Sequence, residues 1–102
     1  MEINEILEER AARYGIFYDQ AAISQRIKTA MSDSPNWPVL PDDMKEALEM
    51  VAGKIARILN GDYTYTDSVI DIIGYMQLVL DRMEDDADHL FLENSLSTEE
   101  GL

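Results

Sequence analysis

Cysteine is absent from this sequence of 102 residues, and only three prolines and five glycines interrupt it. Without cysteine the chain can form neither a disulfide bond nor a thiolate metal site, which is typical of an intracellular protein. Basic residues are also scarce, because 8 lysines and arginines stand against 21 acidic residues and leave a net charge of -13. This charge repels nucleic acids and anionic membranes and favours cations or basic partners.

Long hydrophobic runs are missing too. No apolar stretch approaches the roughly 20 residues that span a bilayer. The acidic N-terminal segment MEINEILEER is unlike a targeting peptide. We therefore expect a cytoplasmic protein that binds neither membranes nor, directly, nucleic acid.

What the sequence does contain is a series of helical patterns. The first covers residues 3–14 and ends at Gly15, a residue suited to a C-terminal cap. Asp19 is expected to cap a second helix. The three prolines of SDSPNWPVLP confine the next segment to a loop. Three apolar residues of this loop are expected to pack back onto the core: Trp37, Val39 and Leu40.

Two longer helices follow the loop. The third should begin near Asp42 or Asp43, since acids suit its first turn, and end at Asn60-Gly61. The fourth should begin between residues 66 and 68, where Ser68 and Asp71 resemble a capping box. The pattern predicts an all-α, four-helix bundle-like domain over residues 1–92, followed by a flexible acidic tail over residues 93–102.

The apolar stripe of the fourth helix is longer than the third helix can cover. At 1.5 Å per residue the stripe extends for roughly 33 Å. The excess predicts a partner surface, so we expect a homodimer or a higher homo-oligomer. The stripe consists of Val69, Ile72, Ile73, Met76, Leu80, Met83, Ala87, Leu90 and Phe91.

Four carboxylates lie off the apolar stripes and form the candidate metal site. Glu46 and Glu49 share one face of the third helix, and Asp67 and Asp71 share one face of the fourth. If the two faces converge, their oxygen atoms could hold Mg²⁺ or Mn²⁺. The alternative is a solvated face on each helix, with the aspartates favoured by the helix dipole.

Two cations and a tyrosine are the candidate ligand-binding residues. Lys54 and Arg57 could meet an anionic group such as a phosphate, and Tyr75 flanks the two aspartates of the fourth helix. Gly53 lies beside these cations in a helix interior, where glycine costs about 1 kcal/mol relative to alanine. Close approach of a ligand or of another backbone would explain that glycine.

Three segments resemble a family of small bacteriophage and prophage proteins of unknown function. They are RYGIFYDQAAISQRIKTAM, then MKEALEMVAGKIARILNGD after a tryptophan, then Y-x-DSVIDIIGY. The similarity extends over most of the chain. It implies a phage gene that is expressed in a bacterial cytoplasm.

A more distant resemblance is to the MazG-like all-α nucleoside triphosphate pyrophosphatases, which bind magnesium through an ExxE pair and a later ExxD pair. Glu46-Ala-Leu-Glu49 matches the first pair, and Ser68-Val-Ile-Asp71 stands where the second should be. Ser68 replaces a ligand glutamate, so the metal set is incomplete by this pattern. The resemblance implies nucleotide binding and leaves hydrolysis in question.

Three functions are compatible with these observations. The first is a phage-encoded MazG-like protein that binds a nucleotide or another phosphate, with or without metal-dependent hydrolysis. The second is a non-catalytic acidic protein that binds a basic host protein, inhibiting a host defence factor or imitating the charge of DNA. The third is an accessory phage protein that only oligomerises.

Overall fold

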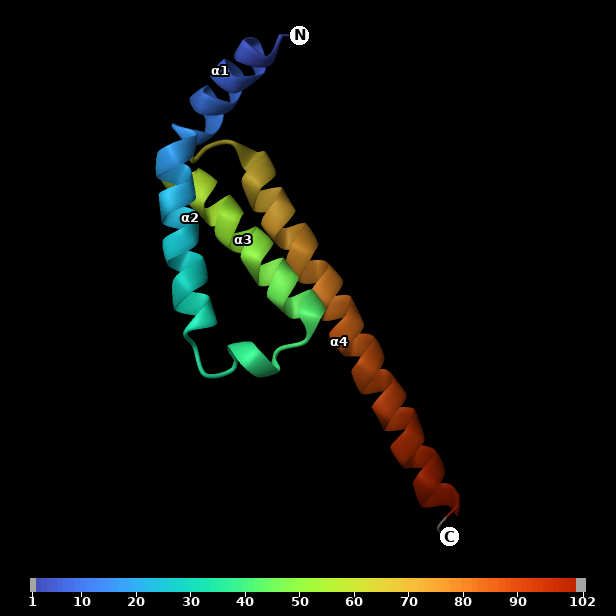
Figure 1. Ribbon diagram of the computed structural model, residues 1–102. Helices are drawn as coiled ribbons and strands as arrows, with labels where there is room; N and C mark the ends of the chain where they lie inside the picture. Colours follow the sequence, from blue (N-terminus) through green and yellow to red (C-terminus); the bar gives the residue numbers. More distant parts are fainter. Residues whose placement is uncertain (1, 101–102) are drawn as a thin grey trace.

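The computed structural model describes residues 2–100, with side chains described for residues 2–90. This part of the chain is entirely helical apart from its turns and contains no strand, which confirms the all-α prediction (Figure 1). The elements are α1 (Ile3–Tyr14), α2 (Phe17–Ser32), a short 3-10 helix, η1 (Trp37–Val39), α3 (Asp42–Asn60) and α4 (Thr66–Glu100).

Most of the predicted helix limits are confirmed. Gly15 ends α1 with a positive φ of 78°, and α3 begins at Asp42 and ends before Gly61. The prediction that Asp19 caps α2 is wrong, because Ile16 precedes the helix and Asp19 lies in its first turn. That position still favours a carboxylate through the helix dipole.

The predicted capping box of α4 is also wrong. The helix begins at Thr66, so Ser68 lies inside its first turn, where it is buried. In the loop, Trp37 is half-buried near the Lys45 ammonium. Val39, by contrast, is 78% exposed and does not pack onto the core as predicted. The predicted domain limit between residues 92 and 93 lies within α4.

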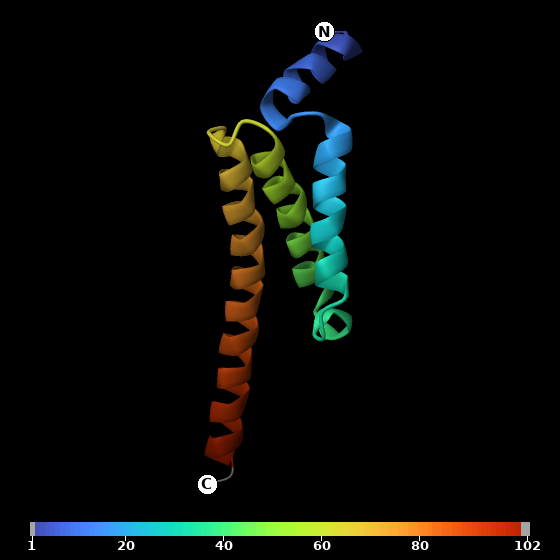
Figure 2. The ribbon, with the colours of Figure 1, turned by 90° about the vertical axis from the view of Figure 1, so that its left-hand side faces the viewer.

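Three of the helices form a single layer, with α3 between α2 and α4 (Figures 1 and 2). Two ion pairs record the antiparallel register of α3 and α4. Lys54 pairs with Asp71 at 3.0 Å, and Asp43 pairs with Arg82 at 2.8 Å. Eleven residues separate the two pairs on each helix, so the register stays constant along the contact.

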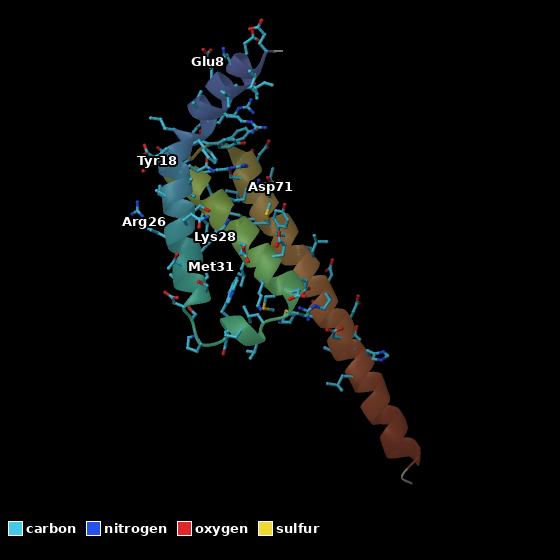
Figure 3. The ribbon with its side chains drawn as sticks, viewed as in Figure 1. Glu8, Tyr18, Arg26, Lys28, Met31 and Asp71 are labelled. Atoms are coloured by element: carbon cyan, nitrogen blue, oxygen red, sulfur yellow. The ribbon has the colours of Figure 1, made fainter. Side chains whose placement is uncertain are left out.

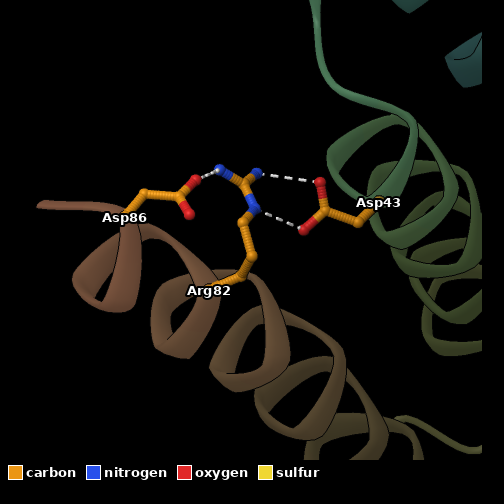
Figure 4. Close-up of polar contacts among 3 residues, drawn as sticks. All are labelled: Asp43, Arg82 and Asp86. Carbon is orange, nitrogen blue, oxygen red and sulfur yellow. Dashed lines mark hydrogen bonds and ion pairs between the residues drawn. The ribbon is translucent and has the colours of Figure 1, made fainter. Parts of the chain in front are cut away.

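The Arg82 guanidinium links α4 to the first turn of α3 (Figure 4). It donates two hydrogen bonds of 2.8 Å to the Asp43 carboxylate and a third of 3.2 Å to Asp86. The hydrogen bonds from Arg82 lower the pKa of Asp43 and, in return, raise the pKa of Arg82. A bidentate pair of this kind fixes both position and orientation.

The core of the layer is small. Within the described side chains the buried apolar residues are three alanines of α3 and one valine of α4, and no large side chain is fully buried. The buried apolar residues are Ala47, Ala52, Ala56 and Val79. A layer of this thickness covers only part of the apolar surface of its helices.

Candidate functional site

Basic side chains gather at the end of the layer where α1 meets α3. Three neighbouring hollows share Arg57 in their walls, with volumes of about 360, 330 and 250 Å³. The first lies between α1 and Arg57 of α3, the second between α1 and the start of α2, and the third is a groove between α2 and α3. Five of the chain's eight basic residues line them: Arg10, Arg13, Lys28, Lys54 and Arg57.

This site is built where the turn between α1 and α2 lies against the turn between α3 and α4; we call this contact the crossing. The Asn60 side-chain amide donates to the carbonyl oxygens of Tyr14 (3.1 Å) and Ile16 (3.0 Å). The backbone N–H of Asp62 donates to the carbonyl of Arg13 at 2.6 Å. The bonds to Arg13 and Tyr14 satisfy carbonyl groups at the end of α1 that have no partner within the helix.

The two glycines at the crossing are required by its closeness. A Cβ atom on Gly15 would collide with the backbone carbonyl of Asn60, and one on Gly61 would collide with the backbone of Arg13 and Tyr14. Gly15 also has φ 78° and ψ -168°, a region of backbone conformation that essentially only glycine enters. The crossing therefore holds α1 in place at one end of the layer.

Aromatic rings separate the arginines at the crossing. The Arg57 guanidinium lies 4.5 Å from the centre of the Tyr14 ring, and Arg13 lies 4.7 Å from the centre of the Tyr65 ring. The two rings are 6.1 Å apart. These contacts order Arg57, Tyr14, Tyr65 and Arg13 into one stack, in which each cation gains a cation–π contact.

The two arginines of the stack differ in their remaining partners. Arg13 pairs with Glu9 at 2.8 Å and donates a 3.0 Å hydrogen bond to the Tyr65 hydroxyl. That hydroxyl in turn donates to Asp67 at 2.7 Å, and this bond raises the pKa of Tyr65. Arg57 forms no ion pair with any carboxylate of the described residues. Its guanidinium donors thus remain open to the hollows.

The groove between α2 and α3 continues the site along the layer. Lys54 contributes to its wall and is held by Asp71, with 14% of the lysine side chain exposed. Lys28 approaches from α2, and Glu49 is the one acid among the lining residues. Gly53 faces open space, since a Cβ atom there would meet nothing within 4 Å. Packing within the chain therefore does not account for this glycine.

The four carboxylates of the predicted metal site do not come together. Asp71 pairs with Lys54, Asp67 accepts from Tyr65, and Glu49 lines the groove towards α2. The Lys54–Asp71 register places Glu49 five residues, or roughly 7 Å, further along α3, and Glu46 lies exposed beyond it. The described residues contain no group of three or more acidic, histidine or cysteine side chains able to hold a metal ion.

Tyr75 lies apart from the other predicted ligand-binding residues. It is half-buried and lines a shallow hollow on α4 with Gly74 and Leu78. Of the predicted set the structure thus brings Lys54 and Arg57 into one groove, and Tyr75 into another.

Sequence reasoning missed the contribution of α1. Arg10, Arg13 and Tyr14 complete the site around Arg57, and none of the three was among the predicted site residues. The available signal lay in three short segments, Arg13-Tyr14-Gly15, Asn60-Gly61-Asp62 and Tyr65-Thr66-Asp67, which all meet at the crossing.

Comparison with protein-family models, with curated proteins and with solved structures finds no match to this chain. Among the described residues, none of the helices has the combined length and apolar character that crossing a membrane requires.

Proposed function

We propose that this protein binds a phosphate-bearing anion, such as a nucleotide, at the hollows around Arg57. The observation that carries the proposal is the gathering of five of eight basic residues at one site in a chain of net charge -13. In so acidic a protein, a local group of positive side chains runs counter to the negative electrostatic potential of the whole chain. Specific contacts must hold these side chains in place. The stack and the crossing are those contacts.

The residues of the site suit the parts of a nucleotide. Arg57 and Arg10 present planar guanidinium groups that can each donate two hydrogen bonds to a phosphate. Phe17, which is 75% exposed beside the same hollows, offers a face on which a base can stack. The open position at Gly53 lets a ligand lie close to the backbone of α3.

The proposal covers binding and includes no hydrolytic step. The resemblance to MazG-like pyrophosphatases supports a nucleotide ligand, and the predicted Mg²⁺ or Mn²⁺ site remains a prediction that the same experiment examines. A metal held jointly by the phosphates and by a carboxylate such as Glu49 would strengthen binding in its presence. An Arg57-centred site would bind without any metal.

Calorimetric titration with inorganic pyrophosphate and with ATP, in EDTA and in Mg²⁺, tests the proposal. Arg57→Ala should raise Kd at least about tenfold, because a charged hydrogen bond contributes about 1.5–3 kcal/mol. Arg26→Ala is the matched control, since Arg26 lies outside the three hollows and points away from the layer (Figure 3). Absence of binding to both anions, or equal losses in the two variants, would contradict the proposal.

A second candidate function rests on the acidic segment of α4. Residues 81–88 carry five acids and a single arginine, and all five acids are exposed. Arg82 is already held by Asp43 and Asp86. The surface therefore offers charge complementarity to a basic host protein, in the manner of nucleic acid phosphates.

Competition with duplex DNA for a purified basic nucleoid protein tests this second function. The double variant Asp85→Asn/Asp88→Asn should compete less well, with a reduced dependence on salt. A variant with two neutralised acids on α1, Glu5→Gln/Glu8→Gln, has the same net charge and serves as the control. Equal competition by both variants would rule out a specific role for the segment.

A further inference from the structure

One side of α4 carries a regular apolar seam that the described residues leave partly exposed. Its residues alternate in steps of four and three, which is the heptad spacing of helices that pack along their length. The seam consists of Val69, Ile73, Met76, Leu80, Met83, Ala87 and Leu90. The exposed fractions of its large side chains range from 37% at Met76 to 62% at Ile73.

Contact with α3 is centred to one side of this seam. The α4 residues that the contact buries are Ser68 and Val79, and the seam lies about 90° around the helix from them. The predicted stripe also included Ile72, which is half-buried, and Phe91, which lies outside the residues whose side chains are described. Half-buried side chains of α3 continue the apolar surface beside the seam: Met44, Leu48, Val51 and Ile55.

The surface area of the chain points to a missing partner of substantial size. A monomer of 11.6 kDa is expected to expose about 5,800 Å², whereas this chain exposes 7661 Å². The difference is about 1,900 Å² and includes the end of α4 that extends past α3 (Figure 1). It exceeds the roughly 800 Å² that each partner buries in a standard interface. A single helical layer needs a second layer to bury its apolar side.

We propose that a second copy of this chain supplies that layer, with its α4 packed antiparallel along the seam. A copy brings an identical heptad seam, so the contact is self-complementary about a two-fold axis. One antiparallel register pairs every seam position from Val69 to Ala87. In this register Val69 faces the partner's Ala87, Ile73 faces the partner's Met83, and Met76 faces the partner's Leu80.

Charge selects the antiparallel orientation. Residues 81–88 carry five acids and one arginine, and a parallel pair would place the two segments side by side. The antiparallel register separates their midpoints by about 20 Å along the axis, which is about twice the screening length at 0.1 M salt. Antiparallel neighbours also place the helix dipoles in their favourable arrangement.

Light scattering and sedimentation across protein concentration test the dimer. The unaltered chain should be dimeric at micromolar concentration, and Leu80→Glu at the centre of the seam should raise the dimer Kd by at least about 30-fold. Leu78→Glu is the matched control, because Leu78 is 67% exposed but lies off the seam. Circular dichroism verifies the helicity of both variants, and Met83→Glu provides a second test of the seam. A monomer at 100 μM or equal effects of Leu80→Glu and Leu78→Glu would overturn the proposal.

A spin label at Asp88→Cys tests the orientation, since the chain has no other cysteine. The antiparallel register places the two labels about 30 Å apart along the axis. In a parallel pair they would lie within about 20 Å, given a spacing of 8–10 Å between helix axes. The longer distance supports the antiparallel dimer, and the shorter one overturns it.

Discussion

The crossing of the two turns and the seam of α4 differ in how far their groups are covered within one chain. At the crossing, backbone groups of Arg13 and Asp62 bond directly, and Gly15 and Gly61 leave no room for a side chain. Along the seam, large apolar side chains such as Ile73 remain exposed over several turns. The crossing is closed by contacts within one chain, whereas the apolar seam stays partly exposed.

This difference separates two sources of stability. Backbone hydrogen bonds at the crossing depend on local geometry and are satisfied within one molecule. Burial of the seam depends on a partner, and its contribution to the free energy of unfolding therefore depends on protein concentration. The two regions should respond differently to mutation and to dilution.

The largest effect should come from closing the space at the crossing. Gly15→Ala would force a Cβ atom against the Asn60 carbonyl and into a conformation that only glycine enters easily. We expect a loss of about 3 kcal/mol in the free energy of unfolding, measured by urea denaturation. Gly74→Ala is the control, because a Cβ atom there meets nothing within 4 Å, and it should add about 0.5–1 kcal/mol. Equal effects of the two would refute the account of the crossing.

Dilution should have a similarly large effect, and it acts on the seam alone. A hundredfold dilution of the proposed dimer should lower its free energy of unfolding by about 2.7 kcal/mol. The melting temperature of the unaltered chain should fall accordingly, whereas that of Leu80→Glu should stay constant. A melting temperature independent of concentration in the unaltered chain would argue against a dimer coupled to folding.

A smaller effect is expected where the groove meets α4. Asp71→Asn removes the partner of Lys54, which is half-buried in the groove wall. The free energy of unfolding should fall by about 1 kcal/mol or less, because nearly half of the Asp71 side chain is exposed. Lys54 would then be free to turn towards the groove, so calorimetry should show pyrophosphate binding severalfold tighter. Weaker binding in this variant would show that Asp71 supports the ligand instead of competing for Lys54.

The smallest effect should appear at alkaline pH. The hydrogen bond to Asp67 raises the pKa of Tyr65, so the stability from this bond is present below about pH 10 and is lost as pH rises through the raised pKa. Thermal melts from pH 8 to 11 should show a steeper loss in the unaltered chain than in Tyr65→Phe. Parallel pH profiles would indicate that this bond does not contribute.

The sequence predicted the helix limits well, and the helix caps and the packing of the loop less well. The limits of α1 and α3 follow from glycines and acids at helix ends, which are local signals. Asp19 and Ser68 failed as caps because each lies inside a first turn, two or more residues after the helix begins. Val39 failed as a core residue because the loop turns its side chain outward, which no local pattern reveals.

Of the candidate site, only the residues on α3 were predicted from the sequence. Lys54 and Arg57 were identified from their places off the apolar stripe, and they do share one groove. Arg10 and Arg13 were not identified, because α1 reaches Arg57 only through the crossing. Convergence of the four carboxylates required Glu49 to face α4, and in the structure it faces α2.

The sequence alone thus determined that this chain is helical, acidic and divided by its prolines and glycines, since these properties follow from short-range backbone preferences. Tertiary structure decided which side of each helix is covered. The heptad of α4 could have packed on α3, but the side of α4 that faces α3 is the one that carries the Lys54–Asp71 and Asp43–Arg82 pairs. The seam stays open because rotation about a helix axis depends on long-range contacts, which periodicity does not specify.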